Sequence, residues 1–300
     1  VENIVPDFLT LLHGVIDSPD IPLNVSRSYL QEDANVKKIS SHISKKVADK
    51  LASMFKQDRE AFAAQWDDLR IFIEYGQLTD DKFMERSKKF LLFKDTTGAC
   101  HTYEELIAAV GEVQKDKNGK IVLPYTSDAK AQHGFVQPAI DHGYKVLVME
   151  GPLAAHVLQK LEQEFSDIQF KRVDSDVVDA LIEKDEQSTS ALNEDQENAL
   201  KPIIEGAFPN DQYKVKFVPM SPTAAPITIT RSEFMRRMKE QQAVGGGGFQ
   251  MFGSLPDSYD VAINANHPLA QKLLNASEDS EKSRIAKRAV DLARLSQGLL

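Results

Sequence analysis

The spacing of apolar residues predicts helices in the first third of the chain. Six of them recur every three or four positions and form one stripe of a helix that begins near Asp33. They are Val36, Ile39, Ile43, Val47, Leu51 and Phe55. Phe62, Trp66, Leu69 and Ile73 continue this spacing, and Thr79-Asp80-Asp81 supplies a cap before Phe83, Phe90 and Phe93. The pattern predicts a three-helix connector with Trp66 packed in its core.

Between residues 120 and 173 the pattern alternates between strand and helix. Strands are expected over 120–125, 145–149 and 168–173, and helices over 127–141 and 153–165, the first of them broken. This order predicts a small parallel sheet layered with helices. A nucleotide-binding domain has the same order, but neither G-x-G-x-x-G nor a P-loop follows the strands. We therefore interpret this part as a scaffold.

The remaining residues predict a mixed α+β domain. Helices are expected over 192–207 and 232–243, strands over 213–218, 226–230 and 259–263, and a last helix on a stripe of Ile285, Ala289, Leu292 and Leu295. The acidic stretch that ends near residue 190 is interpreted as a partly packed connector. The predicted fold class is α/β followed by α+β, in three parts: residues 1–98, 99–189 and 190–300.

Charge and composition exclude some functions. The chain has 300 residues and a net charge of −9, and residues 174–197 hold nine acidic residues against one lysine. Nucleic acid is not an expected partner, because binding to phosphate backbones needs a concentrated positive surface. The seven histidines lack metal-ligand spacing, so no metal site is expected. Neither G-x-S-x-G nor H-E-x-x-H occurs.

The single cysteine and the short apolar runs indicate a cellular location. Cys100 has no partner for an intrachain disulfide, which is typical of a reducing compartment. Apolar runs do not exceed five residues, so we expect neither a membrane span nor a signal peptide. These features predict a cytoplasmic protein. Because the sequence starts at Val1 and is soon hydrophobic, we expect it to be a piece of a longer protein.

The sequence predicts a stiff loop that precedes the first long helix and ends in an arginine. Pro19 and Pro22 fix their own φ angles and keep the residues before them out of the helical region. Apolar residues then alternate with polar ones up to Arg27, so the loop has an anchored face and a presented face. Arg27 either serves a function there or forms a surface ion pair with Asp17 or Asp20.

The run Leu23-Asn24-Val25-Ser26-Arg27, with Leu30-Gln31 after it, resembles the catalytic loop of the 90-kDa heat-shock protein family of ATP-dependent chaperones. The chain is identified as a member of the bacterial branch, with the later middle domain and a truncated C-terminal domain. The resemblance implies that Arg27 reaches the γ-phosphate of ATP, and Asn24 and Gln31 also match the catalytic pattern. ATP and Mg²⁺ would be bound by a missing N-terminal domain, so this chain alone is expected to be inactive. Ser28 stands where most members have Glu.

Two apolar segments are candidates for binding client proteins. The run from Ser232 to Met238 resembles the family's amphipathic helix that contacts clients, which implies roles for Phe234, Met235 and Met238. Four glycines at 245–248 are expected to form a flexible hinge. Phe249, Met251 and Phe252 follow it, and they either dock into the core or present an adaptable surface to unfolded chains.

The segment from Asn264 to Leu269 resembles the family's turn into its C-terminal helices, which form a four-helix dimer bundle. The resemblance therefore implies an ATP-dependent chaperone that remodels unfolded or partly folded clients as a homodimer, with neither nucleic acid nor membrane as a partner. A further bundle helix is expected beyond Leu300. The contrasting hypothesis is a non-enzymatic dimeric scaffold or adaptor, which would need no presented Arg27.

Overall fold

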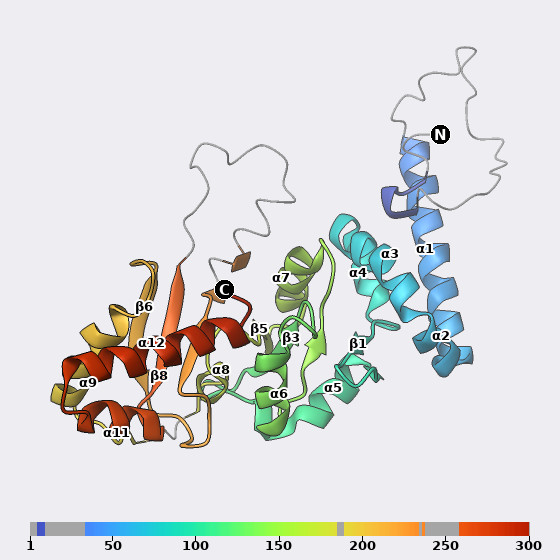
Figure 1. Ribbon diagram of the computed structural model, residues 1–300. Coiled ribbons are helices and arrows are strands. Elements are labelled where there is room, and N and C mark those ends of the chain that lie inside the picture. The colour runs from blue at the N-terminus through green and yellow to red at the C-terminus, as the bar shows by residue number, and fades with distance from the viewer. Residues whose placement is uncertain (1–4, 10–33, 185–188, 234–235, 238–257, 300) are drawn as a thin grey trace, which may run out of the picture. The chain divides into compact units, whose positions relative to one another are not determined.

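A computed structural model describes residues 5–9, 34–184, 189–233, 236–237 and 258–299 (Figure 1). The chain forms two compact units. The first comprises Val1–Phe93, Cys100–Leu106 and His156–Glu164, and the second comprises Lys94–Ala99, Ile107–Ala155 and Phe165–Leu300. The fold class predicted from the sequence, α/β with α+β, is confirmed by one parallel sheet and one mixed sheet among these residues. The division into three parts stays a prediction.

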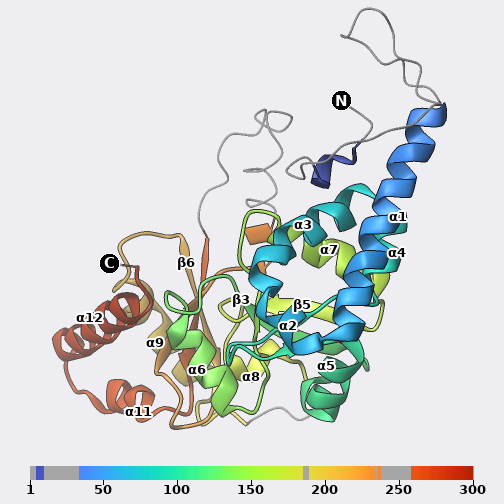
Figure 2. The ribbon, with the colours of Figure 1, turned by 90° about the vertical axis from the view of Figure 1, so that its right-hand side faces the viewer.

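The first unit is built mainly from helices. They are η1 (Asp7–Leu9), α1 (Ala34–Gln57), α2 (Arg59–Ala64), α3 (Trp66–Thr79), α4 (Asp81–Ser87) and most of α7 (Ala154–Glu164). Helix α1 packs beside α4, and η1 packs against α3 (Figure 2). The predicted first helix and the predicted cap are both confirmed, since the Asp80 side chain accepts hydrogen bonds from the amides of Lys82 and Phe83.

Aromatic rings form the core of this connector. Phe83 contacts Phe8 and Phe90 at centroid distances of 4.6 and 6.3 Å, and Phe62 contacts Phe90 at 6.3 Å. Trp66 is 2% exposed, which confirms its predicted place in the core. The structure differs from the predicted pattern in two places: the second helix is broken between α2 and α3, and α4 ends at Ser87.

The second unit contains a parallel sheet. Strand β3 (Ile121–Thr126) lies between β4 (Leu147–Val148) and β5 (Ile168–Arg172) and pairs with both in parallel. Five of the six residues of β3 are buried, as expected for a central strand of a parallel sheet. Helices α6 (His133–Asp141) and α8 (Val178–Leu181) share an apolar cluster with this sheet, to which Val122, Val136 and Leu181 belong. The predicted parallel sheet is confirmed, although the helix expected over 127–141 starts only at His133.

The C-terminal part of this unit contains a mixed sheet covered by helices. The strands are β6 (Tyr213–Val218), β7 (Ile227–Thr230) and β8 (Tyr259–Asn264), and the helices are α9 (Glu194–Glu205), α11 (Pro268–Asn275) and α12 (Asp279–Ser296). Central β8 pairs in parallel with β6 and antiparallel with β7. The three helices lie beside this sheet (Figure 1), and they share one apolar core with it. Of the smaller elements, β2 (Cys100–His101) belongs to the first unit and η2 (Gly111–Gln114) to the second, whereas β1 (Phe93–Lys94) and α5 (Tyr103–Val110) are divided between the two.

Helix α12 buries one side and exposes another. Val290 is fully buried in the core, whereas Leu292 and Leu295 are 66% and 63% exposed. Ile285 and Ala289, which the sequence placed on the same stripe as these leucines, pack partly against their own domain. The predicted stripe is therefore divided between an internal core and an outward apolar surface.

The described ranges show neither a membrane-spanning helix nor a cluster of metal-ligand side chains. None of their helices is long and apolar enough to cross a membrane. The same residues hold no group of three or more His, Cys, Asp or Glu side chains that could bind a metal ion.

A buried carboxyl on α3 predicts a falling stability with rising pH. Glu74 is 5% exposed, and burial raises its pKa from 4.5 to about 7, although Arg70 lies 3.7 Å away and opposes this shift. Between pH 4.5 and 7 the unfolded chain loses this proton while the folded chain keeps it, so the free energy of unfolding falls. We expect Glu74→Gln to remove that fall and to stabilise the first unit by about 2 kcal/mol at pH 8.

Urea unfolding at pH 5 and pH 8 measures this effect. The fluorescence of Trp66, the only tryptophan of the chain, reports on the first unit. The matched control is Glu60→Gln, an exposed position on α2, which should unfold like the parent at both pH values. A parent-like pH dependence in Glu74→Gln would contradict the assignment to this carboxyl.

Candidate functional site

The predicted catalytic residues lie outside the described part of the chain. Asn24, Arg27 and Gln31 all fall within residues 10–33. The role of these residues, and the alternative of an Arg27 ion pair with Asp17 or Asp20, therefore stay predictions.

The predicted client-binding residues also lie outside the described ranges. These residues are Phe234, Met235, Met238, Phe249, Met251 and Phe252. The structure does describe the polar residues that flank the first two of them. Ser232 and Glu233 come directly before Phe234, and Arg236 and Arg237 come directly after Met235. The geometry of the site is built from this polar part of the segment.

Glu233 is the centre of a partly buried polar cluster. Its Oε1 accepts hydrogen bonds from Arg236 Nη2 and Arg237 Nε, both at 2.6 Å, and from the Tyr125 hydroxyl at 3.1 Å. Its Oε2 accepts a hydrogen bond from the backbone amide of Arg172 at 3.2 Å. One carboxylate therefore joins the segment to both β3 and β5 of the parallel sheet.

The charges of this cluster balance the cost of burying the carboxylate. Burial alone would raise the pKa of Glu233, but the positive charges of Arg236 and Arg237 and their hydrogen bonds outweigh it, so the pKa is lowered. The side chain of Arg236 is 7% exposed and that of Glu233 is 21% exposed. Glu233 therefore stays ionised at neutral pH, and charge-assisted hydrogen bonds hold the segment.

The two arginines make further contacts with the sheet. Arg237 Nη2 donates to the backbone carbonyl of Phe170 on β5 at 2.8 Å. Arg236 donates to the Tyr125 hydroxyl, and its guanidinium lies 5.6 Å from the centroid of the Tyr125 ring. Next to them, Arg172 forms a bidentate ion pair with Asp174, at 2.5 and 2.7 Å. The parallel sheet thus serves as the support of the segment.

Sequence reasoning missed Tyr125, Arg172 and Asp174. One signal was present locally: Glu233 precedes Arg236 and Arg237 by three and four residues, the spacing of ion pairs on one helix face. That signal shows the pairing within the segment but not its partner on the sheet. Tyr125 lies 108 residues from Glu233 in sequence, so only the fold brings them together.

The parallel sheet does not fit a nucleotide phosphate at the end of β3. In open α/β sheets, phosphates bind to backbone amides just beyond the carboxyl ends of the strands. Here the Gln132 side chain occupies the first of these amides, since its Oε1 accepts from the Ser127 amide at 3.0 Å and also from the hydroxyl of Thr126 at 2.6 Å. A phosphate would have to displace this chain's own glutamine, so no nucleotide chemistry is derived from this sheet.

The turn from β8 into α11 is built from polar side chains. Asn264 Nδ2 donates to the carbonyl of Ser221 at 2.8 Å, and Asn266 Nδ2 donates to the carbonyl of Met220 at 3.0 Å. His267 Nδ1 caps α11 by accepting from the amide of Leu269 at 3.0 Å, and Pro268 begins the helix. This turn thus fixes the entry into the C-terminal helices.

A parallel sheet layered with helices, followed by a mixed sheet covered by helices, makes this a protein of the α/β and α+β classes. The model of the family described as Hsp90 protein matches residues 1–296, and the chain belongs to that family. It is 46% identical over 298 residues to the chaperone protein HtpG of Porphyromonas gingivalis, covering 98% of this chain and 43% of the relative. It is 42% identical over 300 residues to the chaperone protein HtpG of Bacteroides thetaiotaomicron, with coverage of 99% and 44%. The chain thus spans less than half the length of these relatives.

Proposed function

We propose that this chain is part of an ATP-dependent molecular chaperone of the Hsp90 family, acting in the cytoplasm on unfolded or partly folded clients. Membership of the family supports the proposal, as do relatives whose name is chaperone protein HtpG. ATP and Mg²⁺ bind in a part of the longer protein outside this chain. Arg27 assists hydrolysis there, and Asn24 and Gln31 steady its loop. This chain alone does not hydrolyse ATP.

The observation that carries the client-binding part is the cluster around Glu233. A segment that binds varied apolar chains should be anchored to a rigid element beforehand. Otherwise the free-energy cost of ordering the segment would have to be met by the few contacts that each client makes. Glu233, Arg236 and Arg237 provide such an anchor on β3 and β5. Phe234, Met235 and Met238, together with Phe249, Met251 and Phe252, are proposed to contact the client.

The outward surface of α12 supports a homodimer. Leu292 and Leu295 are largely exposed on a helix whose opposite side is already buried. Apolar residues that are exposed together mark association surfaces more often than single ones do. We propose that these leucines pack against the same helix of a second copy. The contrasting function, a non-enzymatic dimeric scaffold, would use the same surface and would need no client-binding residues.

Changing Phe249, Met251 and Phe252 together to serine tests the client-binding proposal. We expect the variant to lose at least about three-quarters of its ability to suppress aggregation of a chemically unfolded protein, because the adaptable apolar contacts are gone. Its unfolding midpoint in urea should stay within the error of the parent value. Light scattering of the aggregating protein is the measurement.

The matched control replaces exposed apolar residues elsewhere. Val113 and Ile140 are 52% and 39% exposed, and the double variant Val113→Ser, Ile140→Ser should suppress aggregation like the parent. A large fall in the urea midpoint of the triple variant would instead assign the three residues to the core. Equal loss of activity in the control would mean that general surface hydrophobicity is responsible.

A further inference from the structure

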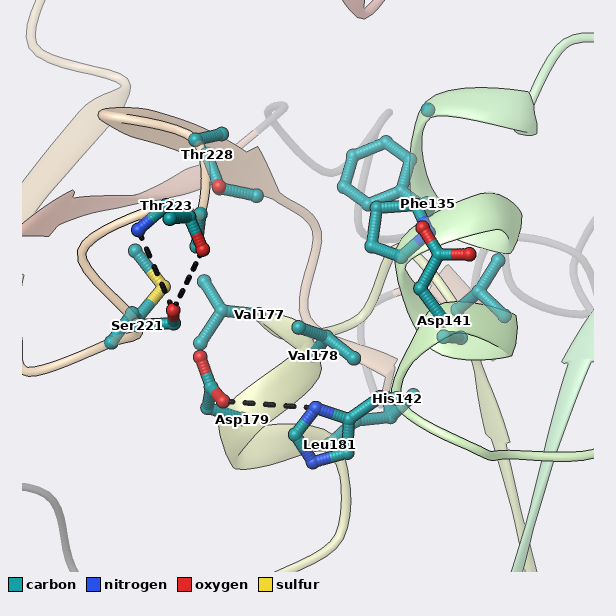
Figure 3. A pocket seen from close by; sticks show the side chains of 17 residues that line it. Phe135, Asp141, His142, Val177, Val178, Asp179, Leu181, Ser221, Thr223 and Thr228 are labelled. Atoms are coloured by element: carbon teal, nitrogen blue, oxygen red, sulfur yellow. Dashed lines mark hydrogen bonds and ion pairs between the residues drawn. The ribbon is translucent and has the colours of Figure 1, made fainter.

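A cleft of about 350 Å³ lies within the second unit, and its lining includes none of the described residues of the clamped segment, 232–233 and 236–237. Helix α6 forms one wall, the chain between β6 and β7 forms the opposite wall, and residues at the start of α8 lie between them (Figure 3). The volume lies in the range of sites that bind small molecules. Nothing in the proposed chaperone function uses this cleft.

Apolar side chains line most of the cleft. Phe135 and Pro138 come from α6, and Val177 and Val178 come from the start of α8. Met220 and Val177 are each 2% exposed and belong to one buried cluster with Ala262. These contacts fix the base of the cleft, so its shape is formed before any ligand enters. An apolar body would be favoured here by burial of its surface.

Two carboxylates stand among the polar groups of the cleft, which also include His142 and the hydroxyls of Ser221, Thr223 and Thr228. Asp141 and Asp179 are among its lining residues, which include no lysine or arginine in the part of the chain that the structure describes. The Asp141 carboxylate already accepts a hydrogen bond from Gln137 Nε2 at 2.8 Å. His142 Nδ1 lies 3.9 Å from Asp179 Oδ1 (Figure 3). This distance is too long for a hydrogen bond.

One oxygen of the Asp179 carboxylate lacks a hydrogen bond. Its Oδ2 is buried and has no hydrogen-bond partner among the described residues. A carboxylate in this position is costly unless an opposite charge comes close. A donor that approached Oδ1 from the cleft would supply that charge. The side chain is 24% exposed, so one side of it is open to such a donor.

We propose that this cleft binds a small amphiphilic amine, with its apolar body between Phe135, Val178 and Met220 and its ammonium group on Asp179 Oδ1. The hydroxyls of Ser221 and Thr223, which are 2.9 Å apart, lie on the opposite wall and can contact a polar substituent. A neutral molecule of the same shape would gain the apolar contacts only. An anion would be repelled by both carboxylates.

Three probes with one ring and different head groups test the proposal on the 300-residue chain. They are 2-phenylethylamine, 2-phenylethanol and phenylacetate. The ¹³C-labelled methyl group of Met220, assigned by Met220→Leu, reports binding by its NMR shift. We expect the amine to bind about fivefold more tightly than the alcohol, as one partly exposed ion pair allows, and phenylacetate to bind most weakly.

Two variants separate the charge from the apolar space. Asp179→Asn should bring amine binding down to that of the alcohol. Ala225→Phe places a ring at an exposed position of the lining and should abolish the shift for all probes, whereas Ala108→Phe on α5 should leave it unchanged. Equal affinity for the three probes, or an unchanged Met220 shift in Ala225→Phe, would overturn the proposal. If Asp179→Asn does not fold, the probe series and Ala225→Phe still decide.

Discussion

Replacing Arg27 by alanine is expected to slow ATP hydrolysis by about tenfold or more in a chain that includes the nucleotide-binding part. Such a chain is made by joining this sequence to the remainder of the Porphyromonas gingivalis relative, of which it covers 43%. Arginine keeps its charge and presents a planar fork of donors to phosphate oxygens. Arginines of this kind contribute roughly 10³ to 10⁵ in rate in fast phosphoryl-transfer enzymes, and slow ATPases should show less.

Nucleotide affinity separates this role from simple binding. An interaction made mainly in the transition state lowers turnover and leaves ground-state binding nearly unchanged. Steady-state hydrolysis and calorimetry with a non-hydrolysable ATP analogue measure the two quantities. Arg27→Lys should recover little activity, because an ammonium group lacks the planar fork.

Arg284→Ala is the matched control. Arg284 is an arginine of α12 whose side chain is 62% exposed, and its ion pair with Glu281 is long, at 3.7 Å. It should hydrolyse ATP at the parental rate. If Arg27→Ala also keeps the parental rate, the catalytic interpretation of the loop fails. Arg27 then returns to the simpler hypothesis, a surface ion pair with Asp17 or Asp20.

Replacing Glu233 by alanine is expected to destabilise the second unit by about 3 kcal/mol. The change removes the carboxylate that accepts from Arg236, Arg237 and Tyr125, and it leaves a largely buried guanidinium without that acceptor. Removing one member of a buried ion pair costs more than the pair contributes, because the remaining charge is no longer compensated. Glu233→Gln keeps the shape and some hydrogen bonds, so it should cost less.

Hydrogen exchange of the backbone amides of β3 and β5 measures the stability of the second unit directly. Fluorescence of Trp66 would not, because Trp66 belongs to the first unit. The control is Glu112→Ala, which removes the partner of Lys115 from an ion pair whose carboxylate is 85% exposed. That change should cost less than about 0.5 kcal/mol. Equal effects of the two substitutions would show that the Glu233 cluster does not stabilise the sheet.

The Glu233 variants also test the link between stability and client binding. In buffer without urea, at a temperature well below the unfolding midpoint, Glu233→Gln should keep the fold. It should still weaken suppression of aggregation, because the contacts that hold the segment on the sheet are weaker. The Phe249, Met251 and Phe252 variant should weaken suppression with unchanged hydrogen exchange. The two results together distinguish loss of the apolar surface from loss of its support.

The sequence by itself determined the elements whose signals are local. Apolar spacing of three and four residues predicted α1, and strand and helix alternation predicted the parallel sheet around β3. The predicted cap was also local, since Asp80 accepts from the amides two and three residues ahead. The family resemblance at Leu23–Arg27 likewise came from adjacent residues. Such signals act over one helical turn or one strand, so a single sequence contains them.

Only the tertiary structure decided what these elements do together. It joined Glu233 to Tyr125, 108 residues away, and it placed Gln132 over the amides at the end of β3. It also divided the stripe of α12, burying Ala289 in part while Leu292 stays exposed. Periodicity shows that a face is apolar but not which surface will cover it. Contacts between distant segments depend on how the sheet and helices pack, and that packing is decided by the whole chain rather than by any one stretch of it.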